Sequence, residues 1–258
     1  MTHCARVRGR EVVLVEDDAA NDRAPRGAFL ARRVAPGMAL LMLWALLVYG
    51  AWIIAPFLAA GSYRWLEGWL YLGAVVVGQS CHRLYVSRRN RELLERRQEI
   101  GAGTQRWDFW WNLLFWPQMA AVSLVAGLDA RHLWSPLSRW WWPVGLLLFA
   151  AGMAVSAWAM GCNRHFEGTV RIQREVSHTV VDTGPYRFVR HPGYLGLSLW
   201  ALAGPALYRS GCALIPALLV VGWLVLRTAL EDRFLHRELA GYADYARRTR
   251  FRLVPGIW

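Results

Sequence analysis

Long apolar runs alternate with short arginine-rich stretches along most of this sequence, and that alternation limits the possible folds more than any other feature. Residues 36–61 contain no charged side chain. Further apolar runs follow at about 65–84, 109–127, 140–161, 194–208 and 212–226. Since about 20 apolar residues in a helix cross the hydrocarbon core of a bilayer, the runs predict membrane helices. The run at 194–208 would form only about 22 Å of helix, so five and six complete spans are both compatible with the sequence.

The predicted fold class is all-α: a polytopic integral membrane bundle of five to six transmembrane helices, with a C-terminal helical hairpin and a cytosolic cofactor loop. Residues 1–33 alternate arginine with acidic residues and are expected to form a disordered cytosolic tail. Residues 34–160 are expected to hold the N-terminal spans and an amphipathic interfacial segment at 86–108. Residues 161–258 are expected to hold the loop, the hairpin and a cytosolic C-terminal tail.

The arginines indicate how the chain is oriented. They are dense before residue 34, in 88–97, in 162–191 and after 226. The intervening loops contain only Arg64, Arg131, Arg139 and Arg209. By the positive-inside rule, both termini and the loop 162–191 face the cytoplasm. The formal charge of +12 could suggest nucleic acid, but the arginines lie between membrane runs, and no nucleic-acid partner is expected.

The most polar part of the loop, residues 177–196, reads S-H-T-V-V-D-T-G-P-Y-R-F-V-R-H-P-G-Y-L-G. Pro192 suits the first turn of the apolar helix that follows. The segment therefore predicts a water-facing loop that enters the membrane, with polar and aromatic side chains at its mouth. Gly193 and Gly196 would let a ligand approach the backbone closely.

A second polar element lies at the cytosolic end of the last apolar run. Arg227 and Glu231 are four residues apart and share a helix face. An ordinary surface ion pair is one interpretation, and His178 and His191 could likewise be ordinary interfacial histidines. Two polar clusters at one membrane face together predict a site that meets a soluble ligand on one side and lipid on the other.

The sequence lacks the residue patterns of nucleophilic catalysis, phosphate binding and metal binding. There is no Ser-His-Asp arrangement and no phosphate-binding glycine loop. The four cysteines, at 4, 81, 162 and 212, are scattered without metal-ligand spacing, and no metal site is expected.

The motif H-T-V-V-x-x-G-P-Y-R-F-V-R-H-P-G-Y-L-G from His178, followed by R-x-x-x-E-D from Arg227, resembles the isoprenylcysteine carboxyl methyltransferase family of integral membrane enzymes. Phospholipid methyltransferases are more distant relatives. The stretch 92–108 and the ending of the chain are similar to the bacterial branch, which implies a bacterial inner membrane. The resemblance covers about residues 85–258 and is most specific in the last hundred.

The resemblance implies S-adenosylmethionine as the cofactor, held by the loop and the hairpin. The matching contact residues are Gln173, His178, Thr179, Val180, Val181, Tyr186, His191, Pro192, Gly193, Tyr194 and Glu231. Arg227 matches the arginine that orients the substrate. Asp232 departs from the motif, which usually has a second glutamate there, and Leu239-Ala240-Gly241 departs from the usual Phe-Gly.

Physical chemistry narrows the methyl acceptor. Methyl transfer from a sulfonium to an anion needs alignment and desolvation more than acid–base help. Arg227 could hold a carboxylate in bidentate fashion, whereas an amine acceptor would need a general base, and none is obvious. The favoured acceptor is the carboxylate of an amphiphilic, isoprenylcysteine-like molecule that enters from the bilayer.

Two other functions are compatible with the sequence. Membrane reductases of the sterol-reductase type, which use NADPH, share a similar R-H-P-x-Y loop, although R-H-P-G-Y-L-G is closer to the methyltransferases. A non-catalytic membrane scaffold is the second alternative.

Overall fold

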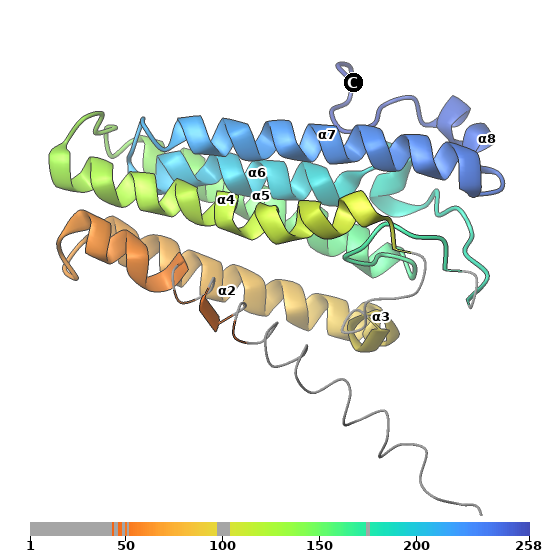
Figure 1. Cartoon of the computed structure of the whole chain (residues 1–258), viewed down its shortest axis with the longest axis horizontal. Helices are drawn as coiled ribbons and strands as arrows, with labels where there is room; N and C mark the ends of the chain where they lie inside the picture. Colours follow the sequence, from red (N-terminus) through yellow and green to blue (C-terminus); the bar gives the residue numbers. More distant parts are fainter. Residues whose placement is uncertain (1–42, 44–45, 48–49, 51, 97–103, 174–175) are drawn as a thin grey trace, which may run out of the picture. The chain divides into compact units, whose positions relative to one another are not determined.

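The computed structural model describes residues 43, 46–47, 50, 52–96, 104–173 and 176–258 (Figure 1). The chain divides into two compact units, Met1–Ala45 and Leu46–Trp258. The expected tail at 1–33 and the first part of the span at 36–61 lie outside the described residues. All the helices labelled in Figure 1 belong to the second unit.

Within the described residues the second unit is helical and contains no strand, which confirms the predicted all-α class. A helix at residues 52–60 is followed by α2 (Leu66–Arg89), α3 (Arg91–Arg96), α4 (Arg106–His132) and α5 (Trp141–Cys162). A short 3-10 helix, η2 (Gly184–Arg187), precedes α6 (Pro192–Tyr208), α7 (Leu214–Glu238) and α8 (Tyr242–Arg248).

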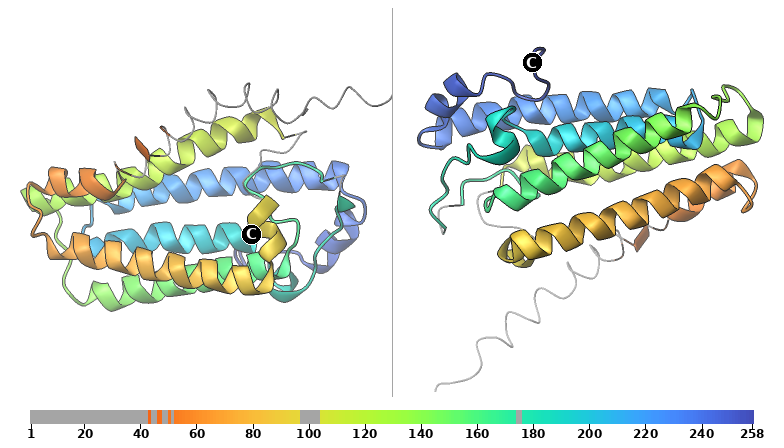
Figure 2. Two further views of the ribbon diagram at one scale, coloured as in Figure 1. Left: turned by 90° about the horizontal axis from the view of Figure 1, so that it is seen from below. Right: turned by 180° about the vertical axis from the view of Figure 1, so that it is seen from behind.

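The long helices α2, α4, α5, α6 and α7 lie along one common axis and alternate in direction (Figures 1 and 2). The α2–α4 connection, the loop 163–191 and the segment after α7 therefore meet at one end of the bundle, which we call the loop end. The opposite end, where α4 turns into α5 and α6 into α7, is called the far end. Among the described residues, the arginine-dense stretches at 88–96, in the loop after α5 and after residue 226 lie at the loop end, whereas the stretch before residue 34 is outside the described residues.

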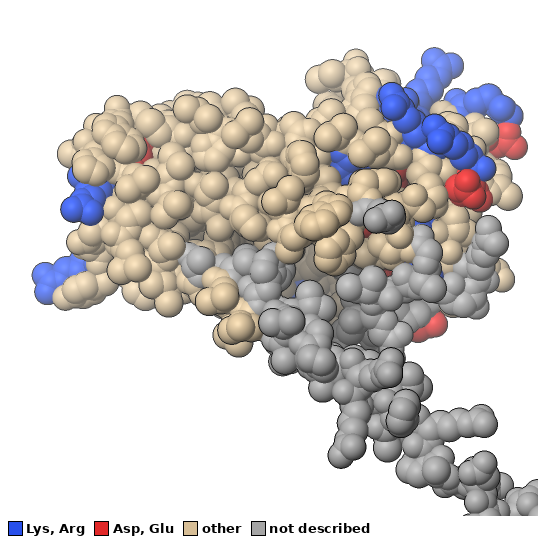
Figure 3. Space-filling model, in the orientation of Figure 1, with Lys and Arg blue, Asp and Glu red and all other residues tan. Residues whose placement is uncertain are grey.

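Three helices are long and apolar enough to cross a membrane: Trp107–His132, Trp141–Cys162 and Leu214–Glu238. Large apolar side chains such as Leu147 and Leu219 are exposed on them, as expected for a surface in contact with lipid. Charged side chains gather at the two ends of the unit, and the surface between them is uncharged in the view of Figure 3. α6 has 17 residues, about 26 Å of helix. This agrees with the short first arm expected from the sequence.

α6 is held mainly by α5, through glycines. A Cβ added at Gly152 would lie 2.6 Å from the carbonyl oxygen of Gly196, and one added at Gly196 would lie 2.6 Å from that of Gly152. Two backbones this close leave no room for a side chain between them. The space at the Cβ position of Gly196 is therefore filled by α5, and the approach of a ligand to the Gly196 backbone stays a prediction.

The predicted interfacial segment at 86–108 is only partly described. α2 continues to Arg89, α3 covers six residues, and residue 106 already belongs to α4. Leu93 is buried in a small cluster with Val86 and Met160. Residues 97–103 lie outside the described part of the chain. Over its described part, the segment packs on the loop end of α2 and α5.

Candidate active site

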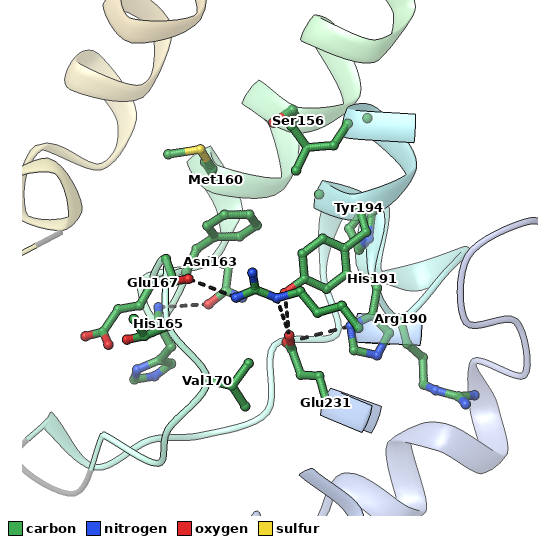
Figure 4. A pocket seen from close by; sticks show the side chains of 18 of the residues that line it. Ser156, Met160, Asn163, His165, Glu167, Val170, Arg190, His191, Tyr194 and Glu231 are labelled. Atoms are coloured by element: carbon green, nitrogen blue, oxygen red, sulfur yellow. Dashed lines mark hydrogen bonds and ion pairs between the residues drawn. The ribbon is translucent and has the colours of Figure 1, made fainter. Parts of the chain in front are cut away.

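A cavity of about 310 Å³ lies at the loop end of the bundle (Figure 4). Its walls come from α2, α4, α5, the loop after α5, the start of α6, the end of α7 and α8. One part of the lining is polar and includes Arg227 and Glu231. The other part is largely apolar and includes Phe115 and Trp200. The cavity can therefore receive a molecule with a polar and an apolar part.

The structure brings nearly all the residues singled out in the sequence to this cavity. Its lining includes His178, Thr179, Val180, Val181, Tyr186, His191, Pro192, Gly193, Tyr194, Arg227 and Glu231. Gln173 is not part of the lining. Its side chain is buried and donates a hydrogen bond to the carbonyl oxygen of His165 at 2.8 Å. Gln173 thus holds the loop in shape beside the cavity, and its contact with a cofactor stays a prediction.

Gly193 lines the cavity and also packs closely against the loop. A Cβ added there would lie 2.6 Å from the ring of Phe166. The space that the missing side chain leaves is therefore occupied by the loop, which packs directly onto the first turn of α6. Gly193 permits this close packing of loop and helix.

Glu231 reaches the cavity from α7 and is held from the start of α6 (Figure 4). The hydroxyl of Tyr194 donates a hydrogen bond to its Oε2. The Nδ1 of His191 lies 3.7 Å from its Oε1. The Glu231 side chain is still 21% exposed. The carboxylate is thus fixed in position and keeps capacity to accept hydrogen bonds from a ligand.

Arg227 is buried, with its side chain 4% exposed. Its Nη2 lies 2.8 Å from Oδ1 of Asp108 and donates to the carbonyl oxygen of Gly168 at 2.8 Å. Nη1 donates to Asn112 at 3.4 Å, and the guanidinium lies 4.0 Å from the centre of the Trp111 ring. The interpretation of Arg227 and Glu231 as a surface ion pair is therefore wrong: Arg227 is buried, and its closest acidic partner is Asp108.

One nitrogen of Arg227 is left without a partner. Within the described residues, its buried Nε has no hydrogen-bond acceptor, and the nearest oxygen of Glu231 is 4.0 Å away. A buried donor without an acceptor is costly, and such groups are rare in native structures. Since Arg227 lines the cavity, the arrangement fits a ligand oxygen that accepts from Nε.

Asp108 is a functional candidate that the sequence interpretation missed. It is fully buried in the first turn of α4, and its Oδ2 accepts a hydrogen bond from the backbone N–H of Val170 at 2.7 Å. Asp108 therefore connects α4, the loop and α7 behind the cavity wall. The sequence did contain a signal for this role, because Asp108 is an acidic residue at the start of an apolar run. A charge buried at such a position needs a partner.

Asp232, noted in the sequence only as a departure from the motif, is the centre of a second buried network. Arg190 binds it with two hydrogen bonds, of 2.8 and 3.0 Å. Arg252 and the hydroxyl of Tyr242 donate to it at 2.9 and 2.8 Å. The shorter aspartate thus fits among three donors, and the C-terminal segment is fastened to the loop.

Electrostatics stabilise this network in its charged form. Burial alone would lower the pKa of Arg190, but the hydrogen bonds and charge of Asp232 outweigh it and raise the pKa. Burial raises the pKa of Tyr242, and the Asp232 carboxylate raises it further. Arg190 therefore stays charged and Tyr242 stays a hydroxyl donor at neutral pH.

Backbone hydrogen bonds also connect the loop to the C-terminal segment. The N–H groups of Arg190 and His191 donate to the carbonyl oxygens of Phe251 and Arg252, each at 2.9 Å. The residues immediately before α6 are therefore positioned by the C-terminal segment.

Residues 144–237 match the model of the isoprenylcysteine carboxyl methyltransferase family. The matched region contains α6, α7 and the loop that line most of the polar part of the cavity. Over these residues the chain is similar to isoprenylcysteine carboxyl methyltransferases.

Curated proteins from plants and yeast are similar to this isoprenylcysteine carboxyl methyltransferase-like chain. A probable protein-S-isoprenylcysteine O-methyltransferase of Oryza sativa subsp. indica is 27% identical over 134 residues, which cover 50% of this chain and 70% of the rice protein. Protein-S-isoprenylcysteine O-methyltransferase B of Arabidopsis thaliana is 29% identical over 147 residues, covering 54% of this chain and 74% of the plant protein. The Saccharomyces cerevisiae protein-S-isoprenylcysteine O-methyltransferase is 32% identical over 110 residues, covering 41% of this chain and 46% of its own length.

Proposed function

We propose that this chain is an integral membrane methyltransferase that uses S-adenosylmethionine to methylate a carboxylate on an amphiphilic acceptor. The observation that carries the proposal is the buried Arg227, which lines the cavity together with Glu231 and whose Nε has no hydrogen-bond acceptor among the described residues. The family match and the names of the similar plant and yeast proteins support a methyltransferase. They do not favour the reductase alternative.

The residues around Glu231 fit the cofactor. When bound, S-adenosylmethionine supplies a methyl group on a sulfonium, and transfer to a carboxylate yields a methyl ester and S-adenosylhomocysteine. The fixed, partly exposed Glu231 carboxylate can accept hydrogen bonds from ribose hydroxyls or an ammonium group. The N-terminus of α6 favours a negatively charged group such as the cofactor carboxylate.

Arg227 fits the acceptor. Asp108 and Gly168 engage its Nη2, and Trp111 lies against its face, so the guanidinium is held in one orientation. The unpaired Nε can then donate to a carboxylate oxygen of the acceptor. Holding the acceptor in line with the methyl group is most of what this chemistry requires. Because a carboxylate is already an anion, no general base is needed.

The apolar walls fit the remainder of the acceptor. Phe115, Trp116, Leu197 and Trp200 line the cavity on α4 and α6. An acceptor that enters from the bilayer could place its chain there and its carboxylate at Arg227. With the arginine-rich loop end on the cytoplasmic side, the soluble cofactor would reach the site from the cytosol.

Ligand-dependent thermal unfolding of the detergent-purified protein tests the proposal. We expect S-adenosylmethionine and S-adenosylhomocysteine to raise the melting temperature and NADPH to leave it unchanged. A ligand at a hundred times its dissociation constant stabilises the fold by about 2.7 kcal/mol, which is measurable. Stabilisation by NADPH alone would instead support a reductase, and stabilisation by none of them would support a scaffold.

A further inference from the structure

The apolar part of the cavity contains a polar patch on one wall. Gln79 and His82 on α2 and Ser156 on α5 line the cavity, and we call these three residues the polar wall. Figure 4 shows Ser156 and Glu231 on opposite sides of the cavity. Ser156 therefore lies apart from Glu231, the residue that the proposed function assigns to the cofactor.

Gln79 and His82 lie on the inner face of α2, whereas a helix at a water-exposed surface turns its polar residues outward. Val75 and Val86 are buried, and Gln79 and His82 lie between them on the same face, at spacings of three and four residues. Val77, by contrast, is 63% exposed on the outer side of α2. Val77 therefore lies on the outer face of α2, whereas the amide of Gln79 and the imidazole of His82 lie on its inner face. Polar residues placed in this way in membrane helices mark functional cavities.

Gln79 gives the polar wall unused hydrogen-bonding capacity. The Nε2 of His82 lies 3.5 Å from Oγ of Ser156, at the limit of a hydrogen bond. In the described part of the chain, no hydrogen bond is made by the carboxamide of Gln79. The lining also includes apolar side chains such as Phe115 and Leu197. An amide that faces an apolar cavity gains from a ligand that supplies a donor or acceptor.

We propose that the polar wall binds a second polar group, a hydroxyl or a carbonyl, on the chain of the methyl acceptor. The acceptor is then a lipid-like carboxylic acid with an oxygenated chain, in place of a plain isoprenyl or alkyl chain. This inference rests on the proposed function, because it uses Arg227 to fix the carboxylate end. A site that hydrogen-bonds a substrate hydroxyl discriminates strongly against the analogue that lacks it.

A purely structural role for the polar wall makes a different prediction. The contact between His82 and Ser156 could simply join α2 to α5, as polar pairs between membrane helices do. Gln79 adds nothing to that contact. A structural role would change stability when these residues are replaced, but it would not change the preference between two acceptors that have the same carboxylate end.

The experiment compares acceptors that differ only along the chain. The detergent-purified protein is given S-adenosylmethionine and either N-acetyl-S-farnesylcysteine or analogues with one hydroxyl at successive positions of the farnesyl chain. We expect one analogue to exceed the plain acceptor about tenfold in kcat/KM, the range of one added hydrogen bond. The same analogue should stabilise the S-adenosylhomocysteine complex against heat more than the plain acceptor does.

Variants then assign that preference to the polar wall. Gln79→Leu and His82→Leu should bring the ratio to about one, whereas Val77→Leu on the outer side of α2 should keep it. Equal or better use of the plain chain by the wild-type protein overturns the inference and leaves the proposed function intact. A preference that survives Gln79→Leu also overturns it. Methylation of no acceptor, with no stabilisation by adenosyl ligands, overturns the proposed function and this inference with it.

Discussion

Two buried aspartates, both on α4, differ in how completely their surroundings satisfy them. Asp129, at the far end, accepts hydrogen bonds from the backbone N–H of Ser135 at 2.8 Å, from the Ser135 hydroxyl at 2.7 Å and from the Ser210 hydroxyl. These contacts join the α4–α5 turn to the α6–α7 turn. Asp108, at the loop end, is paired with Arg227, a cation that retains an unpartnered nitrogen.

The difference separates a structural cluster from a binding site. The hydrogen bonds around Asp129 come from the protein itself, so the cluster can only hold the turns together. The pair at the loop end has a donor left over, and it belongs to Arg227, a residue that lines the cavity. A ligand with a hydrogen-bond acceptor could complete the hydrogen bonding of such a buried donor.

The largest expected effect is that of Arg227→Ala. Loss of the group that orients the acceptor should lower kcat/KM about 10²–10³-fold, measured as methyl ester formation with N-acetyl-S-farnesylcysteine. Affinity for S-adenosylhomocysteine should change little, since Glu231 is retained. Arg209→Ala is the matched control, because Arg209 is paired with Glu67 at the far end, 2.9 Å away. Full turnover in Arg227→Ala would remove this residue from the mechanism.

The two aspartates can be compared directly as Asp108→Asn and Asp129→Asn. Asparagine at 108 can still accept from Val170 but lacks the charge that positions Arg227, so kcat should fall about 10–100-fold, and loss of the buried ion pair should also lower the melting temperature. Asparagine at 129 should leave turnover per folded molecule unchanged and cost about 1–3 kcal/mol of unfolding free energy. Full turnover per folded molecule in Asp108→Asn, or its loss in Asp129→Asn, would refute this division of roles.

A smaller effect is expected for Glu231→Gln, which removes a charge from the part of the site assigned to the cofactor. Affinity for S-adenosylhomocysteine should fall about tenfold in isothermal titration, the range of one charge-assisted hydrogen bond. Glu238→Gln, on the exposed end of the same helix, is the control. Unaltered affinity in Glu231→Gln would place the cofactor elsewhere in the cavity.

The smallest effect is expected for Asp244→Asn. Asp244 pairs with Arg247 on α8, and both side chains are well exposed. An exposed pair of this kind contributes at most about 0.5 kcal/mol, so neither melting temperature nor turnover should change measurably. A clear loss of either would mean that charge at the loop end matters beyond the buried networks.

The helical bundle could be predicted from the sequence because each span depends only on a local run of apolar residues. Apolar runs and arginine-rich loops can be recognised without knowing which helices are in contact. The common loop end then follows from the alternating direction of the helices. The loop residues and Glu231 were likewise found together because a continuous motif carries most of them. His191 and Tyr194, for example, belong to the motif and contact Glu231 from the start of α6.

What the sequence did not reveal depends on contacts between distant segments. Asp108 reads as one acidic residue beside an apolar run, and only packing brings it to Arg227. The sequence likewise does not show that Phe166 and Gly152 occupy the Cβ positions of Gly193 and Gly196. Asp232 looks like a minor substitution, whereas its shorter side chain is the meeting point of Arg190, Tyr242 and Arg252. The role of a glycine or of a shorter side chain can be assigned only when the residue packed against it is known.

The bonds from Arg190 and His191 to the segment at 251–252 also govern when the site can form during synthesis. The ribosome makes the loop and α6 before the residues that fasten them, so a nascent chain can insert its helices into the membrane while the cavity mouth is still unassembled. Cofactor binding would then begin only after residues 249–252 have left the ribosome. A stalled or prematurely released chain would occupy the membrane as a bundle without transferring methyl groups.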